Sequence, residues 1–104
     1  GSYEERTLAL EYSTPIESVF KLYQNTPNPF RSSTQIAFEL PKAAAATLSV
    51  YDAAGKLVKK VEGDFKAGYH QITLDSGDWQ GSGVYYYRLE TAENAATRSL
   101  IVLE

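Results

Sequence analysis

The chain has no cysteine among its 104 residues, and this absence excludes several kinds of site. Without thiols it can build no disulfide framework, no cysteine nucleophile and no cysteine-ligated zinc centre. Positive charge is also scarce, because 10 Lys and Arg stand against 13 Asp and Glu, for a net charge of −3. Nucleic-acid binding needs a basic surface, so the composition argues against that class of partner.

Long apolar runs are missing as well. The longest candidate, residues 100–103, falls far short of the roughly 20 residues that a membrane-spanning helix needs. No N-terminal signal peptide is visible. The chain opens with Gly1-Ser2, a pair typical of a cleaved expression tag. We therefore expect residues 1–17 to be a tag remnant followed by a linker or the tail of a passenger protein, with one short strand possible within residues 3–16. Residues 18–104 should form one domain.

What the sequence does contain is a repeated two-residue alternation of apolar and polar side chains. It runs through residues 18–24, 33–41, 46–52, 56–62, 69–75, 83–90 and 97–103, with turn residues between the stretches. Eight tyrosines strengthen the preference for strands. Such even spacing is typical of an all-β antiparallel sandwich or barrel.

The alternation also predicts which side chains form the core and where the chain turns. Residues 52–55, with the sequence DAAG, suit a hairpin in which Gly55 takes a positive φ. The alanine-rich residues 42–47 follow Pro41 and are read as a loop, and residues 56–62 should be half exposed. The predicted inward residues are Phe20, Leu22, Ile36, Phe38, Leu40, Leu48, Val50, Ile72, Leu74, Tyr85, Tyr87 and Leu89.

Catalytic chemistry finds little support, and we expect neither an enzyme nor a cofactor or metal site. The single histidine, His70, lies in a predicted strand and is interpreted as a partly buried or rim residue. Asp64, Asp75 and Asp78 lack the regular spacing of a calcium loop and are interpreted as turn residues. Trp79 either closes one end of the sandwich or, less favoured, stacks on a sugar.

Residues 23–33, YQNTPNPFRSS, are the most unusual stretch. Pro27 and Pro29 lack N–H donors and cannot lie in a central strand, and they favour extended conformations at Thr26 and Asn28, so the segment is expected to be a stiff, non-repetitive rod. Asn25 and Asn28 should bond back to nearby backbone and fix turns at its start and within it. Phe30 either anchors the rod to the core or is displayed. The segment is thus either a rigid structure that protects a sheet edge or a preformed ligand.

Several stretches together resemble the type A C-terminal sorting domain of the type IX (Por) secretion system. They are LYQNTPNPF, TQIAFELP, LSVYDAAGKLV, AGYHQITLD, GSGVYYYRLE and a final apolar strand, in that order. The resemblance implies an Ig-like β-sandwich of about seven strands. The positions that match the family's motifs are Gln24, Asn25, Pro27, Asn28, Pro29, Phe30, Asp52, Gly55, Gly83, Val84, Tyr85 and the last strand with Leu100, Ile101, Val102 and Leu103. The family commonly ends in a basic residue, whereas here Arg98 is the last one.

The resemblance further implies a secretion role. The domain would direct an N-terminal passenger through the periplasm and the type IX outer-membrane translocon, where shuttle and sortase proteins are its partners. A cell-surface sortase would then remove it, within residues 3–18, and attach the passenger to anionic lipopolysaccharide or release it. The passenger would end on the cell surface, in the outer membrane or outside the cell.

Two mechanistic expectations complete the sequence-based interpretation. If the last strand lies at a sheet edge, a partner can extend the sheet by main-chain pairing, and deleting residues 100–104 should block export while the rest stays soluble. The alternative function is an Ig-like carbohydrate-binding or adhesion module that uses Trp79, Asp75, Asp78 and Tyr86.

Overall fold

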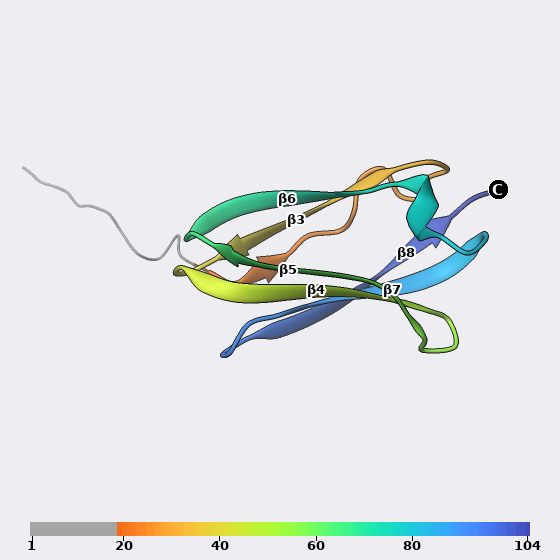
Figure 1. The fold of residues 1–104 in the computed structure, drawn as a ribbon. Coiled ribbons are helices and arrows are strands. Elements are labelled where there is room, and N and C mark those ends of the chain that lie inside the picture. Colours follow the sequence, from red (N-terminus) through yellow and green to blue (C-terminus); the bar gives the residue numbers. More distant parts are fainter. Residues whose placement is uncertain (1–18) are drawn as a thin grey trace, which may run out of the picture.

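The computed structural model describes residues 19–104, which form two antiparallel sheets packed face to face (Figure 1). One sheet has the order β2-β3-β6 and the other β5-β4-β7-β8, so the predicted all-β, Ig-like sandwich of about seven strands is confirmed. The expected linker and short strand before residue 19 lie outside the described residues. The elements are β2 (Lys21–Leu22), β3 (Thr34–Leu40), β4 (Ala44–Asp52), β5 (Leu57–Phe65), β6 (Gly68–Leu74), the 3-10 turn η3 (Ser76–Asp78), β7 (Gly83–Glu90) and β8 (Ala95–Val102).

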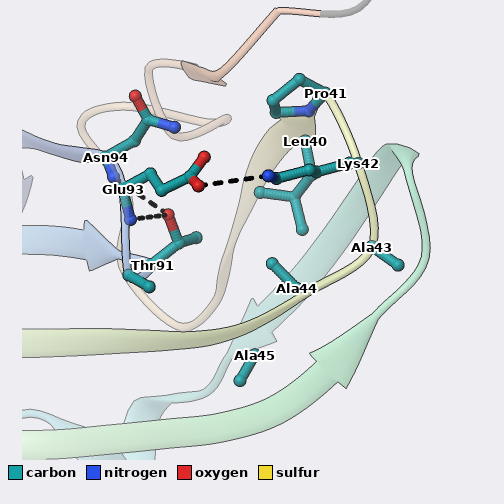
Figure 2. A pocket seen from close by; sticks show the side chains of 10 residues that line it. Leu40, Pro41, Lys42, Ala43, Ala44, Ala45, Thr91, Glu93 and Asn94 are labelled. Carbon is teal, nitrogen blue, oxygen red and sulfur yellow. Dashed lines mark hydrogen bonds and ion pairs between the residues drawn. The ribbon is translucent and has the colours of Figure 1, made fainter.

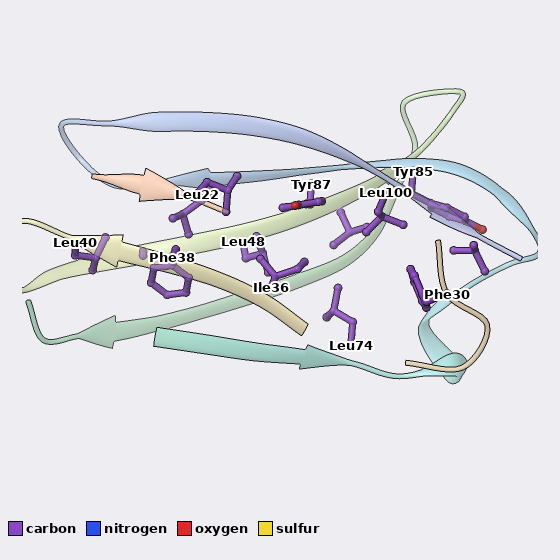
Figure 3. Close-up of a cluster of buried hydrophobic side chains, with 14 residues drawn as sticks. Leu22, Phe30, Ile36, Phe38, Leu40, Leu48, Leu74, Tyr85, Tyr87 and Leu100 are labelled. Carbon is purple, nitrogen blue, oxygen red and sulfur yellow. The ribbon is translucent and has the colours of Figure 1, made fainter. Parts of the chain in front are cut away.

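The core fills the space between the two sheets, because alternate residues of each strand point inward (Figure 3). Each large apolar side chain buried there contributes about 1.5–3 kcal/mol to the hydrophobic stabilisation. Phe20 and Ile72 are half-buried at its margin, and the other predicted inward residues are buried. Leu100 and Val102 from β8, together with Ala46, join the core as well.

The loop predicted for residues 42–47 is wrong from Ala44 onward. There β4 begins, and Ala44, Ala45 and Ala46 pair with Phe65, Asp64 and Gly63 of β5. Alanine has little preference for strands, so the local sequence gave no signal. Pairing with the adjacent β5 strand and burial of the Ala46 side chain decide the conformation.

The hairpin turn between β4 and β5 follows its prediction. Gly55 has φ of 88°, a conformation that favours glycine. The Asp52 carboxylate accepts hydrogen bonds from the backbone N–H groups of Ala54 and Lys56, each over 2.9 Å. The strand that follows is half exposed, as expected, with Leu57 accessible to water and Val61 partly covered.

His70 is partly buried, as the sequence predicted, and its ring lies against Phe38 and Phe65. One ring nitrogen is 2.7 Å from the carbonyl oxygen of Lys66. The histidine ring therefore packs against two aromatic rings, and one of its nitrogen atoms contacts the backbone. Within residues 19–104, the helical segment is far too short to cross a membrane.

Candidate functional site

The segment that begins the unusual stretch is fixed by a hydroxyl group from the opposite sheet. Tyr87 of β7 is fully buried, and its hydroxyl donates to the Tyr23 carbonyl oxygen over 2.8 Å. The Tyr87 hydroxyl oxygen also accepts a hydrogen bond from the backbone N–H of Asn25 over 2.9 Å. Burial raises the pKa of Tyr87 above the usual 10.0, although the Asn25 N–H and the charge of Arg98 act in the opposite direction. Tyr87 was predicted only as a core residue, and its polar role left no signal in the sequence.

Asn25 organises the turn that follows, as the sequence predicted. Its side chain is buried, and its Nδ2 donates to the carbonyl oxygen of Pro27 and to the hydroxyl of Thr34, each over 3.1 Å. The Thr34 hydroxyl in turn donates to the Pro27 carbonyl oxygen over 2.9 Å. Two buried polar side chains, those of Asn25 and Thr34, therefore satisfy each other and the Pro27 carbonyl group, which stabilises the conformation of a non-repetitive segment.

The segment at residues 26–29 contains the turns that the sequence predicted. The chain bends at residues 27–29, and the Thr26-Pro27 and Asn28-Pro29 peptide bonds are both cis. We call residues 24–30 the motif loop, because they carry the first group of family motif positions.

The motif loop lies along the outer edge of β8, the last strand of its sheet. Nε2 of Gln24 donates to the Ser99 carbonyl oxygen over 2.7 Å, and the Ile101 N–H donates to Oδ1 of Asn28 over 3.0 Å. The expected local bond of Asn28 is thus replaced by one to a residue 73 positions away. Edge strands leave such N–H and C=O groups unpaired, and here side chains supply the partners.

Phe30 continues the coverage with its own backbone and anchors the motif loop in the core. Its N–H donates to the Ile101 carbonyl oxygen over 3.1 Å, and its carbonyl oxygen accepts the Leu103 N–H over 2.7 Å. Its ring is 3% exposed and meets Trp79 edge-on at 5.2 Å, so of the two alternatives the anchoring one is right. The outer edge of β8 is consequently occupied from Ser99 to Leu103.

Most of the other predicted motif positions also lie against the terminal strand. Gly83, Val84 and Tyr85 pair with Val102, Ile101 and Leu100 on the inner edge of β8. Nε of Arg98 donates to the Leu22 carbonyl oxygen over 2.6 Å and ties β8 to the other sheet. The structure therefore brings the first motif, the β7 motif and the terminal strand into one contiguous unit.

Two predicted positions do not join the motif loop. Asp52 and Gly55 form the β4–β5 turn, where the Asp52 carboxylate is bonded to its own hairpin. Asp52 faces Tyr85 in the β4–β7 register, but its side chain makes no bond to the motif loop among the described residues. Asp52 and Gly55 therefore stabilise the conformation of the β4–β5 hairpin turn.

The residues considered for sugar binding have structural partners. Trp79 is half-buried, and its ring packs edge-on against Phe30 and Tyr85, so it closes this end of the sandwich. Asp78 accepts the backbone N–H of Asp75 over 3.0 Å and forms an ion pair with Lys59 over 2.9 Å. These contacts agree with the interpretation of Asp75 and Asp78 as turn residues and of Trp79 as a residue that closes the sandwich.

A groove of about 340 Å³ lies at the opposite end of β4 and β7, between the β3–β4 and β7–β8 connections (Figure 2). Leu40, Pro41 and three alanines line one wall, and an exposed ion pair between Lys42 and Glu93 spans 3.1 Å across it. The lining offers neither a nucleophile with a base nor a set of ligands. In the part of the chain that the structure describes, no group of three or more His, Asp or Glu side chains could hold a metal ion.

Comparisons with known proteins agree with this arrangement. No curated protein sequence matches the chain. Among solved structures, the chain is similar to dimeric latent PorU from Porphyromonas gingivalis, with 21% identity and a TM-score of 0.64. It is also similar to a beta-glucosidase from Listeria innocua in complex with glucose, with 14% identity, a TM-score of 0.45 and coverage of 82% of this chain and 16% of the glucosidase chain.

The PorU similarity covers 77% of this chain but 9% of the PorU chain, and it concerns the fold. A family match covers a similar part of the chain, because residues 23–103 match the secretion system C-terminal sorting domain. That range includes the motif loop, β7 and the terminal strand, which the fold places together. This chain belongs to the family of secretion system C-terminal sorting domains.

Proposed function

We propose that the domain is the export address of a passenger protein joined to its N-terminal side. Membership of the sorting-domain family supports a role in type IX secretion. In the proposed sequence of events, the domain reaches the outer-membrane translocon from the periplasm and is recognised there. A cell-surface sortase then removes it and attaches the passenger to anionic lipopolysaccharide or releases it. The domain performs no reaction and is itself the substrate.

The observation that carries the proposal is the bonding between the motif loop and the terminal strand. Gln24 and Asn28 satisfy backbone groups of Ser99 and Ile101, and Phe30 does so for Ile101 and Leu103. Two sequence signals that lie more than 70 positions apart therefore form one surface. We propose that the export machinery recognises this composite surface, and that neither the loop nor the strand acts alone.

The composite surface changes the expected mode of recognition. β8 does lie at a sheet edge, which strand addition requires. However, the motif loop already occupies that edge between Ser99 and Leu103, so a partner could pair there only after the loop had left. Side chains displayed beside the edge are accessible without any such rearrangement.

The test is an export assay with a reporter protein that carries residues 1–104 at its C-terminus, in a bacterium with a type IX system. Asn28→Ala removes the acceptor of the Ile101 N–H. We expect surface delivery of the reporter to fall several-fold while the purified domain remains folded, because a single net hydrogen bond contributes only about 1 kcal/mol.

The control is Thr91→Ala in the β7–β8 turn, which should lower the stability of the domain by a similar amount. The Thr91 hydroxyl accepts hydrogen bonds from the backbone N–H groups of Glu93 and Asn94. This variant should lose comparable stability and still export the reporter. Equal export by both variants, at equal melting temperature, would contradict recognition of the composite surface.

A further inference from the structure

The outward face of the β5-β4-β7-β8 sheet carries apolar side chains at the end near the motif loop. Leu57 faces Tyr51, and Tyr51 faces Tyr86, so one row crosses three strands. Val84 faces Ile101 in the adjacent row. Leu57, Val84, Tyr86 and Ile101 are 41–47% exposed. We call these five residues the outer apolar strip.

The outer apolar strip contrasts with the rest of the same face. The solvent-exposed face of an antiparallel sheet normally carries polar residues, which alternate along each strand with the apolar residues of the inner face. Beyond the strip it does so, with ion pairs between Lys60 and Glu62 and between Arg88 and Glu90, each over 3.4 Å. Because these four charges are paired, this side of the strip presents no net charge that would attract an anionic lipid headgroup or a polyanion.

The strip is continuous with the site described above. Ile101 belongs to the terminal strand, and its backbone N–H is bonded to Asn28 of the motif loop. A shallow hollow connects the two, with Tyr86 on one side and Gln24, Arg98 and Ser99 on the other. A partner that rests on the strip would therefore touch the composite surface at the same time.

We propose that the outer apolar strip is the docking surface for a protein of the export machinery that presents an uncharged, apolar face. This inference rests on the proposed function and specifies where recognition occurs. Tyrosine side chains such as that of Tyr86 are among the usual anchors of such contacts. The strip is accessible while the motif loop stays bonded to β8, so docking needs no opening of the sandwich.

The size of the strip argues against a second copy of this chain as the occupant. A fully buried aromatic side chain covers about 150–250 Å², so five half-exposed residues present a few hundred Å². A stable complex buries about 800 Å² on each partner. The strip is too small for a stable dimer and suits a transient contact, which a protein in transit requires.

The test uses the same reporter with the double variant Leu57→Thr and Tyr86→Thr, two strip positions outside the motif loop and the terminal strand. Threonine keeps the strand preference and removes the apolar anchor. We expect the melting temperature of the domain to change little and export to fall about fivefold or more, the loss that one interface anchor causes. Each single variant should show part of the effect.

The matched control is Tyr69→Thr, because Tyr69 is 55% exposed on the outer face of the other sheet. It should export the reporter like the unmodified domain. Normal export by the double variant, with export lost in Asn28→Ala, would overturn the docking surface and leave the proposed function standing. Normal export by both the double variant and Asn28→Ala would contradict recognition of the composite surface as well as the docking surface. Self-association or glycan binding that Tyr86→Thr abolishes, with export intact, would assign the strip to another partner.

Discussion

A single hydroxyl group connects the start of the motif loop to β7. Tyr87 stands in β7, beside the terminal strand, and its hydroxyl holds the backbone of Tyr23 and Asn25 at the start of the motif loop. The ring is completely buried, so water cannot replace either bond. Loss of this hydroxyl would leave a backbone N–H and a carbonyl group without partners inside the protein, which is more costly than losing an exposed bond.

We therefore predict that Tyr87→Phe lowers the free energy of unfolding by about 1–3 kcal/mol. Urea unfolding at neutral pH measures the change. The neighbouring Tyr86→Phe is the control, because Tyr86 is exposed and its substitution should stay within about 0.5 kcal/mol. Equal values for the two variants would contradict a structural role for the Tyr87 hydroxyl.

The same residue gives the protein a pH dependence with a definite sign. Burial raises the pKa of Tyr87 above the usual 10.0, so the folded protein holds this proton more tightly than the unfolded chain. The stabilisation is complete below pH 10.0 and is lost as the pH rises through the folded-state pKa. The stability of the unmodified domain should therefore fall more steeply above pH 10.0 than that of Tyr87→Phe, in which the other tyrosines still titrate.

At the scale of elements, the motif loop acts as a cover for an edge strand. Its bonds to Ser99, Ile101 and Leu103 occupy backbone groups that would otherwise be available to another chain. We predict that Asn28→Ala increases amide hydrogen exchange at Ile101 and Leu103 while amides of the central strand β4 keep their protection. Exchange measured by NMR resolves the individual amides, and a uniform increase would indicate global destabilisation instead.

The sequence predicts those features of the elements that depend on residues close together in the chain, and it does not predict those that depend on residues far apart. The alternation in β3 and β7 identifies Phe38 and Tyr87 as core residues, because the two-residue period is local information. Asp52 and Gly55 identify the hairpin for the same reason. The start of β4 at Ala44 and the bond from Ile101 to Asn28 depend on strands brought together by the fold, which local patterns do not encode. The turns expected near Pro27 and Pro29 are present, because the turn preferences of Asn and Pro are local as well.

At the scale of the whole molecule, the terminal strand belongs both to the proposed recognition surface and to the hydrophobic core. Leu100 and Val102 are buried, whereas Ile101 is 41% exposed. Removing a buried leucine alone costs about 2–5 kcal/mol, against a total stability of about 5–15 kcal/mol for a typical domain. The expectation that the domain stays soluble without residues 100–104 considered only a role of this segment in recognition. It did not include the contribution of Leu100 and Val102 to the core.

We predict that deletion of residues 100–104 abolishes cooperative thermal unfolding or lowers the melting temperature drastically. Ile101→Thr, which changes the exposed face of the same strand, should unfold cooperatively near the original temperature. Circular dichroism during heating distinguishes the two. A truncated domain that melts like the intact one would show that the terminal residues do not contribute to the core, and export of such a truncation would then be interpretable as loss of an address.

The pairing of the motif loop with β8 also has a mechanical consequence. The bridge between Phe30 and Val102 is parallel, so the first and last segments of the domain run side by side in the same direction. A force that pulls the chain before Val19 away from Glu104 would draw these segments past each other in opposite directions. The bonds of Gln24, Asn28 and Phe30 would then be loaded together in shear, and the sandwich would not unzip one bond at a time. A domain pulled at its two ends in this way would transmit tension while it remains folded.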